Sequence, residues 1–197
     1  MGKLREAIED FNKAIEIDST IAIIYNNRGL AETQIGEYEV AIKDYQKAIA
    51  IDSTNPYPYN NLGLLQFYQR KYEEAIGNFN TAIKLNPSFA MPYNNRGLAQ
   101  YSLGNNNEAM ADYNKALKLD STIGKAYNNR GLVEYQLGKY KEALQDFNKA
   151  IEFEPNEPLA YSNRAATEEK LGRSEDAIKD YDKAIELKQK LNPNNKN

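Results

Sequence analysis

Residues 22–55 read AIIYNNRGLAETQIGEYEVAIKDYQKAIAIDSTN, and the chain repeats this pattern with a period of 34 residues. A tyrosine marks each copy, at Tyr25, Tyr59, Tyr93, Tyr127 and Tyr161. A small residue follows four positions later, at Gly29, Gly63, Gly97, Gly131 and Ala165. Three further columns keep the same spacing in six copies: Ala7, Ala41, Ala75, Ala109, Ala143 and Ala177; Phe11, Tyr45, Phe79, Tyr113, Phe147 and Tyr181; Ala14, Ala48, Ala82, Ala116, Ala150 and Ala184. A fixed period of this length predicts a repeat architecture.

The spacing inside one copy predicts two helices. Tyr25 and Gly29 share one helical face, and Gly36 is placed to end that helix, because a residue without a Cβ commonly follows a helix C-terminus. Ala41 and Tyr45 begin the stripe of the second helix. Helix axes approach to about 8 Å only where side chains are small. We therefore expect Gly29 and Ala41 to mark close crossings, with the aromatic rings filling the space beside them.

This combination of an aromatic residue, a small residue four positions later, and then Ala, aromatic and Ala resembles the tetratricopeptide repeat (TPR) family. The proline that the family carries at the hairpin end stands here as Pro87 and Pro155, while Ser53 and Ser121 occupy two equivalent positions. The resemblance covers the chain except the tail from 192 to 197. It implies an all-α fold, a right-handed α–α superhelix (solenoid) of TPR helical hairpins.

The repeat columns also predict the domain organisation, a single TPR solenoid over residues 1–191. It consists of a half repeat at 1–21 and of full repeats at 22–55, 56–89, 90–123, 124–157 and 158–191, followed by a disordered tail at 192–197. Residues 4–17 match only the second helix of a hairpin. We interpret this half repeat either as part of a longer array or as an edge that meets another surface.

Composition argues against several classes of function. The 25 Lys and Arg against 28 Asp and Glu give a net charge of −3, which does not suit a protein that follows a phosphate backbone. The chain contains no Cys and no His, which are the usual transition-metal ligands and common catalytic groups. No apolar run is long enough to span a bilayer. We therefore expect a cytoplasmic protein that is not an enzyme, has no cofactor or metal, binds no nucleic acid and does not insert into a membrane.

Arginines and aspartates covary across the repeats. The position after the double Asn holds Arg28, Leu62, Arg96, Arg130 and Arg164, and sixteen residues later stand Asp44, Asn78, Asp112, Asp146 and Asp180. The one copy that lacks the Arg also lacks the Asp. We therefore predict an ion pair inside each hairpin, with the guanidinium fork directed at the carboxylate. The alternative is that these arginines face a carboxylate of a ligand.

In the TPR family the first helices line a concave groove, and the resemblance implies a peptide-binding groove here. At about 100° per residue, the positions that turn away from the Tyr and Gly stripe belong to this groove. They form two Asn rows, a Leu row and an aromatic row. The candidate peptide-binding residues are Asn26, Asn27, Leu30, Asn60, Asn61, Leu64, Phe67, Asn94, Asn95, Leu98, Tyr101, Asn128, Asn129, Leu132, Tyr135 and Asn163.

The Asn rows have two interpretations. An Asn side chain carries both a donor and an acceptor, so a row of them can hold the backbone of an extended peptide. The rows resemble the asparagine ladder in the TPR arm of O-GlcNAc transferase, which implies a groove that reads backbone with weak sequence preference. Alternatively, the Asn side chains satisfy local backbone groups and the Leu row seals adjacent helices. The carboxylate clamp of chaperone-tail adaptors is disfavoured, because Asn26 occupies its first Lys position and Asn129 replaces its Arg.

Three functional hypotheses follow. The leading one is a protein-interaction scaffold that binds a partner peptide or protein segment in the concave groove. The first alternative is a self-assembling structural module, a homo-oligomer formed through the half repeat at residues 4–17. The second alternative is the regulatory arm of a larger enzyme.

Overall fold

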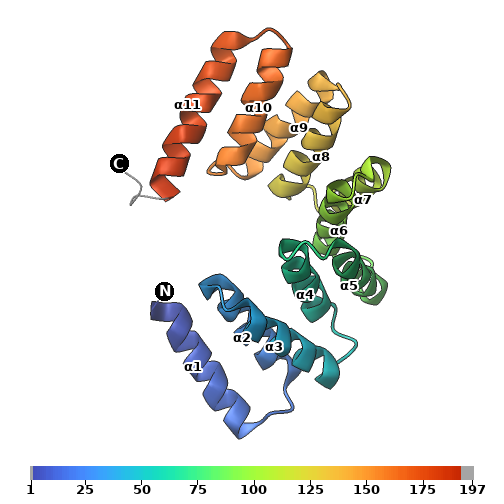
Figure 1. Ribbon diagram of the computed structural model, residues 1–197, viewed down its shortest axis with the longest axis vertical. Helices are drawn as coiled ribbons and strands as arrows, with labels where there is room; N and C mark the ends of the chain where they lie inside the picture. Colours follow the sequence, from blue (N-terminus) through green and yellow to red (C-terminus); the bar gives the residue numbers. More distant parts are fainter. Residues whose placement is uncertain (1, 192–197) are drawn as a thin grey trace. The chain divides into compact units, whose positions relative to one another are not determined.

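The computed structural model describes residues 2–191, and within this range the chain is entirely helical apart from short connections (Figure 1). The eleven described helices are α1 (Gly2–Ile17), α2 (Ala22–Ile35), α3 (Tyr38–Ile51), α4 (Pro56–Tyr68), α5 (Tyr72–Leu85), α6 (Ala90–Ser102), α7 (Asn106–Leu119), α8 (Gly124–Gln136), α9 (Tyr140–Phe153), α10 (Pro158–Lys170) and α11 (Ser174–Leu191). The all-α class predicted from the sequence is confirmed. The tail that we predict to be disordered, 192–197, lies outside the described residues.

The chain divides into two compact units, Met1–Leu103 with helices α1 to α6 and Gly104–Asn197 with helices α7 to α11. The division falls between α6 and α7, inside the predicted repeat 90–123. We describe each unit by itself, and the single solenoid over residues 1–191 stays a prediction.

Within each unit, a first helix packs against the second helix of its own hairpin and against the second helix that precedes it. In the first unit α2 contacts α3 and α1, and α4 contacts α5 and α3; in the second unit α8 contacts α9 and α7. The apolar stripes explain this packing, because Ala41, Tyr45 and Ala48 on α3 are completely or almost completely buried. These clusters extend from one hairpin to the next: Tyr45 of α3 shares a core with Leu62 and Leu65 of the following hairpin.

The close crossings lie where the sequence predicts them. A Cβ placed on Gly29 would lie 2.8 Å from Cε1 of the Tyr45 ring, and one on Gly131 would lie 2.8 Å from Cε1 of Phe147. Non-bonded carbon atoms do not approach so closely, so glycine at this column lets the ring of the second helix lie directly against the first helix.

The turn between the two helices of a hairpin requires a left-handed backbone. Gly36 has φ of 86° and Gly138 has φ of 74°. The second copy carries Arg70 at this column, with φ of 61°. Glycine adopts this conformation without a steric penalty, whereas a residue with a Cβ pays about 1–2 kcal/mol. Arg70 is therefore a locally strained position that the surrounding hairpin imposes.

Candidate interaction surface

The predicted ion pair inside the hairpin is confirmed in three copies. Arg28 donates from Nε to Asp44 Oδ2 at 2.6 Å and from Nη2 to Oδ1 at 2.7 Å. The same two bonds join Arg130 to Asp146 and Arg164 to Asp180, at 2.5–2.7 Å. The carboxylates are buried, so these arginines are held by the protein itself and are not available to a ligand carboxylate. Arg96 and Asp112 belong to different units, and their pairing stays a prediction.

Each arginine also donates a hydrogen bond to an Asn of the preceding hairpin. The sequence analysis did not predict this contact. Arg28 donates from Nη1 to Asn12 Oδ1 at 2.6 Å, and Arg130 donates to Asn114 at 2.6 Å. Arg96 and Arg164 make the same bond to Asn80 and Asn148. A signal was present in the sequence, because an Asn stands sixteen residues before every Arg of the column. One guanidinium therefore ties three helices together.

The exceptional copy replaces this network with another. Leu62 occupies the Arg position and is buried against Tyr45, and the residue sixteen positions before it is Gln46 instead of Asn. Asn78 donates to Oε1 of Gln66 at 2.6 Å, so a neutral amide pair stands where other copies hold an ion pair. The loss of the Arg is thus matched at both of its partner positions.

The two Asn rows form a continuous chain of side-chain hydrogen bonds in the first unit. Within each pair, the first Asn donates to the second at 3.2 Å, as Asn60 does to Asn61. The second Asn then donates to the first Asn of the preceding repeat: Asn61 to Asn26 at 3.0 Å and Asn95 to Asn60 at 3.0 Å. In the second unit Asn163 donates to Asn128 at 2.9 Å.

The Asn chain changes how the candidate residues can act. Asn26, Asn60, Asn94 and Asn95 are buried, and the amides of all four lie within the chain of bonds. Asn27, Asn61, Asn128, Asn129 and Asn163 are half-buried. Hence only the half-buried amides are accessible to a peptide, and the buried ones link adjacent first helices. The sequence reasoning gave both Asn rows the same role; the structure separates the buried positions from the accessible ones.

The apolar candidates differ in accessibility. Leu30 is exposed, while Leu64, Leu98 and Leu132 are half-buried. The half-buried aromatic row packs inward: the Phe67 ring lies 5.4 Å from that of Tyr72, and the Tyr135 ring lies 5.3 Å from that of Tyr140. Burial raises the pKa of Tyr101, the third member of this row.

The most exposed apolar residues of this face lie one helical turn before the second Asn row. Ile23 and Tyr57 occupy equivalent positions in successive repeats and are 57% and 53% exposed. Ile23, Asn27 and Leu30 follow one another along α2 at i, i+4 and i+7, so they share one helical face. We define the interaction face of the first unit as the exposed and half-buried residues at the equivalent positions of α2, α4 and α6: Ile23, Asn27, Leu30, Tyr57, Asn61, Leu64, Met91 and Leu98.

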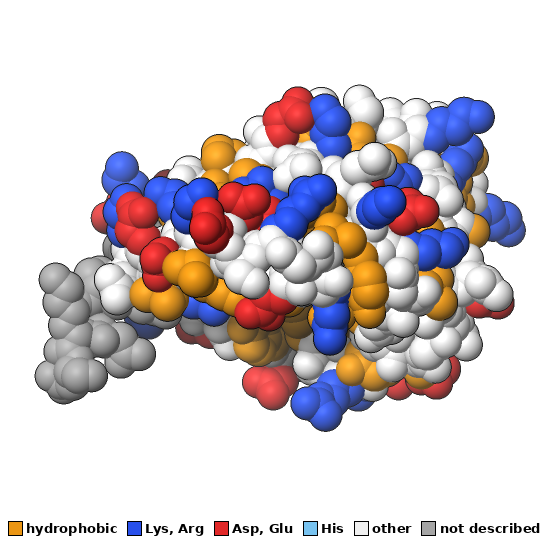
Figure 2. All heavy atoms as spheres, turned by 90° about the horizontal axis from the view of Figure 1, so that it is seen from above, with side chains coloured by type: hydrophobic (Ala, Val, Ile, Leu, Met, Phe, Trp, Pro, Cys, Tyr) orange, Lys and Arg blue, Asp and Glu red, His pale blue; other side chains and the backbone are white. Residues whose placement is uncertain are grey.

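Charge is distributed unequally between the first and second helices. Helix α4 contains no charged residue, and the only one in α6 is Arg96, which donates to Asn80. In α2 the charged residues are Arg28 and Glu32. Arg28 forms ion pairs with both Asp44 and Glu32. The second helices carry exposed charges of both signs, for example Glu39 and Lys43 on α3. On the face of the molecule seen in Figure 2, basic and acidic side chains are interspersed.

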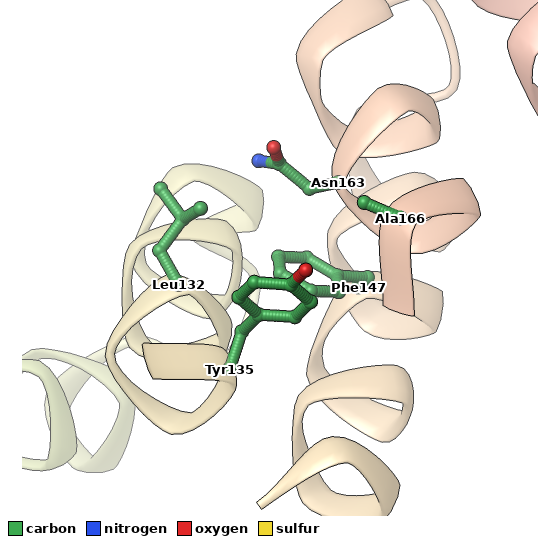
Figure 3. A pocket seen from close by; sticks show the side chains of 5 residues that line it. All are labelled: Leu132, Tyr135, Phe147, Asn163 and Ala166. Carbon is green, nitrogen blue, oxygen red and sulfur yellow. The ribbon is translucent and has the colours of Figure 1, made fainter. Parts of the chain in front are cut away.

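A small pocket in the second unit gathers several of the predicted residues. It has a volume of about 50 Å³ and is lined by Leu132, Tyr135, Phe147, Asn163 and Ala166. Figure 3 shows Leu132 and Tyr135 extending from one helix, and Asn163 and Ala166 from the helix that faces it. Three of the five lining residues are candidates from the sequence. The pocket could accept a methyl group or a small apolar side chain, and the Asn163 amide at its edge supplies polar contacts.

A carboxylate lies buried beside the ion pair of several hairpins. Glu32 Oε2, Glu134 Oε2 and Glu168 Oε2 are buried and accept no hydrogen bond from the described residues. Burial and then the Asp44 carboxylate raise the pKa of Glu32 to about 7, against the opposing effect of Arg28. Burial and Asp146 likewise raise the pKa of Glu134 to about 7, and the pKa of Glu168 is also raised, mainly by burial. The sequence reasoning identified the Asp of each cluster but not this second acid.

Two searches bear on other kinds of site. Among residues 2–191 no three of the side chains Asp, Glu, Cys or His converge in a way that could hold a metal ion. None of the described helices is long and apolar enough to cross a membrane.

Comparison with known proteins identifies the repeats over nearly the whole chain. A family model described as "TPR repeat" matches residues 1–32, 29–70 and 66–104, and one described as "Tetratricopeptide repeat" matches residues 90–123, 124–157 and 158–195. Among curated protein sequences, none matches the chain.

Solved structures share the fold. YrrB, whose structure is described as "a TPR protein with an unusual peptide-binding site", is 26% identical, with a TM-score of 0.65 and 95% of each chain covered. PilF from Pseudomonas aeruginosa is 22% identical, with a TM-score of 0.80, and the match covers 98% of this chain and 86% of PilF. MamA is 24% identical, with a TM-score of 0.67, and the match covers 83% of this chain and 95% of MamA. The latter two likenesses concern the fold alone.

Proposed function

The chain belongs to the tetratricopeptide repeat family, and from this premise we propose that it is a protein-interaction module that binds an extended segment of a partner protein along the interaction face. Proteins of this family generally act through protein–protein contacts and not through catalysis. The peptide-binding site named for YrrB, which is 26% identical, supports this proposal.

One observation carries the proposal: the interaction face exposes large apolar side chains and contains no charged residue. Ile23, Leu30 and Tyr57 remain exposed although burial of such side chains is favourable by about 1.5–3 kcal/mol each. A soluble protein rarely groups exposed apolar side chains without a binding role. Because burying an unpaired charge is costly, an uncharged apolar face favours a segment that is itself uncharged and apolar where it contacts the face.

The half-buried Asn residues give this face a means of holding backbone. Asn61 donates one amide hydrogen to Asn26 and accepts one bond from Asn60. A primary amide has a second hydrogen and its oxygen a second lone pair, and both are available to a peptide group. The surrounding Asn bonds fix the rotamer of Asn61, so little side-chain entropy is lost when a peptide binds.

The experiment uses the full chain and a random-sequence peptide display library, followed by affinity measurement on the enriched peptides. The face variant carries Ile23→Lys and Tyr57→Lys, two exposed positions of the interaction face. The matched control carries Gln46→Lys and Ala50→Lys, which add the same charge at exposed positions of α3. Circular dichroism establishes that both variants keep their helix content.

We expect the enriched peptides to be poor in Asp, Glu, Lys and Arg, and to bind the face variant at least tenfold more weakly than the control. Equal binding to the face variant and to the control would place the peptide elsewhere and overturn the proposal. The same library is also selected on the face variant. If the unaltered chain enriches no peptide beyond those that the face variant enriches, the proposal is overturned as well.

A further inference from the structure

The Leu row is interrupted in the last repeat, where Ala166 occupies the position that Leu132 holds in the repeat before it. Both residues line the pocket between α8 and α10, two helices that pack against each other in the second unit (Figure 3). Ala lacks the three terminal carbons of Leu, and these carbons form an isopropyl group. The pocket therefore lies beside a position where the other copies carry an isopropyl group and this copy does not.

The lining of the pocket suits a small aliphatic group better than water. Leu132 and Ala166 present only carbon, Phe147 adds the ring of a fully buried side chain, and none of the five lining residues is charged. A buried water molecule typically makes about three hydrogen bonds, and an apolar cavity without such partners stays dry. The volume of about 50 Å³ favours a short branched side chain over an aromatic ring.

A second change in the last repeat leaves a hydrogen-bond acceptor open at the edge of the pocket. In the first unit the first Asn of each pair donates to the oxygen of the second, as Asn60 does to Asn61 at 3.2 Å. The last repeat carries Ser162 at the first position, and its hydroxyl donates to the Pro158 carbonyl at 3.3 Å instead. Asn163 Oδ1 therefore accepts no bond from the described residues, while its nitrogen donates to the preceding repeat at 2.9 Å.

The open acceptor and the pocket lie on one side of α10. Asn163 and Ala166 are three positions apart, so their side chains are neighbours on the helix surface. The bond from the Asn163 nitrogen fixes the orientation of the amide, so its oxygen is already in place for a ligand. A group that enters the pocket thus passes beside a fixed hydrogen-bond acceptor.

We propose that this pocket binds the side chain of a valine in an extended segment of a partner protein, and that Asn163 Oδ1 accepts a hydrogen bond from a peptide N–H beside that valine. The isopropyl group of valine supplies the three carbons that Ala166 lacks. The peptide N–H supplies the donor that Ser162 does not. The inference rests on the proposed function, because the valine belongs to a bound, uncharged segment, and it adds a selective subsite in the second unit.

The probes are blocked pentapeptides, acetyl-Ser-Ala-X-Ala-Ser-amide, in which X is Gly, Val or Phe. They are titrated into the isotope-labelled full chain, and proton–nitrogen correlation spectra follow the Asn163 side-chain amide and the Ala166 backbone amide. The Asn61 side-chain amide, followed in the same spectra, reports on the interaction face of the first unit. We expect saturable shifts at the pocket, with the Val peptide binding about tenfold more tightly than the Gly peptide because three carbons leave water. The Phe peptide should bind no better than the Gly peptide.

Two variants change the size of the pocket. Ala166→Leu fills it with the residue that the column carries elsewhere, and should lower the affinity for the Val peptide to that for the Gly peptide. Ala111→Leu is the matched control, because it adds the same three carbons at an exposed position of α7. Leu132→Ala enlarges the pocket, and should shift the preference from the Val peptide to the Phe peptide.

Several results would overturn the proposal. They are the absence of saturable shifts at Asn163 and Ala166, equal affinity for the Val peptide and either other peptide, and equal binding of the Val peptide to Ala166→Leu and Ala111→Leu. Shifts at Asn61 without shifts at the pocket would overturn the valine subsite and leave the proposed function standing. Val-selective shifts at the pocket alone would support the subsite, and would count against binding on the interaction face.

Discussion

Replacing Glu32 by Gln should stabilise the protein at pH 8 and have little effect at pH 5. Glu32 is 3% exposed, and its Oε2 is buried without a described partner beside the Asp44 carboxylate. The Arg28 guanidinium is already engaged by Asp44 in two bonds, and its Nε lies 3.8 Å from Glu32 Oε1. Two acids thus share one base in a buried site, and Glu37 adds a further negative charge nearby.

The direction follows from the pKa of Glu32, which is raised from 4.5 to about 7. Between these values the folded protein binds a proton that the unfolded chain releases, so stability falls as pH rises from 4.5 through 7. At 1.36 kcal/mol per pH unit the difference gives about 3 kcal/mol as an upper bound. The neighbouring Arg and partial solvent screening reduce it, and we expect about 1–2 kcal/mol. Gln is sterically suitable, since the equivalent positions hold Gln66 and Gln100.

The assay is urea denaturation of the unaltered chain and of Glu32→Gln at pH 5 and at pH 8, followed by circular dichroism. Glu9→Gln serves as the control, because Glu9 is exposed on α1 and should change stability by less than about 0.5 kcal/mol at either pH. A Glu32→Gln effect of the same size at both pH values, or a loss of stability at pH 8, would refute the assignment of a raised pKa to this carboxyl.

Three further changes test the packing, each by urea denaturation. Gly63→Ala should lower the free energy of unfolding by about 1–2 kcal/mol, because the added Cβ would lie 2.8 Å from Cε1 of the fully buried Phe79. Gly77→Ala is the control: Gly77 has open space around it, so this change should leave stability unchanged or raise it. Arg70→Gly should stabilise by about 0.5–1 kcal/mol by relieving the left-handed backbone, and an unchanged midpoint would contradict that strain. Arg130→Lys should cost about 1–2 kcal/mol, because an ammonium group cannot reproduce the paired bonds to Asp146; a cost near zero would show that the fork geometry contributes little.

The fold was predictable because each repeat column records a steric requirement. Gly29 could be assigned to a close crossing from the sequence, since small residues recur at this column, and a Cβ on Gly29 would lie 2.8 Å from Cε1 of the Tyr45 ring. The Arg28–Asp44 pair was predictable because the copy with Leu62 changed at both positions together. The position of Arg70 in a left-handed turn was not predictable from its own type, because the hairpin geometry there overrides the preference of the residue.

The candidate surface was less predictable, because periodicity gives the direction of a side chain but not its burial. The sequence placed Asn26 and Asn27 on one face, and only the packing of adjacent first helices separates the buried Asn26 from the half-buried Asn27. The bond from Arg28 to Asn12 was not predicted, because the covariation of opposite charges identifies only the Asp partner of each Arg. The raised pKa of Glu32 depends on burial beside Asp44, which no pattern of residue types specifies.

The hydrogen bonds between neighbouring hairpins also determine which insertions and deletions the fold tolerates. Arg130 reaches back sixteen residues to Asn114, and Asn163 reaches back thirty-five residues to Asn128, in both cases to the neighbouring copy. Duplicating or excising one whole period brings the next copy into the same position, and its donors then meet equivalent acceptors. An insertion of any other length within a helix rotates donors and acceptors out of line. Duplication of whole 34-residue repeats is therefore the change in chain length that preserves these hydrogen bonds.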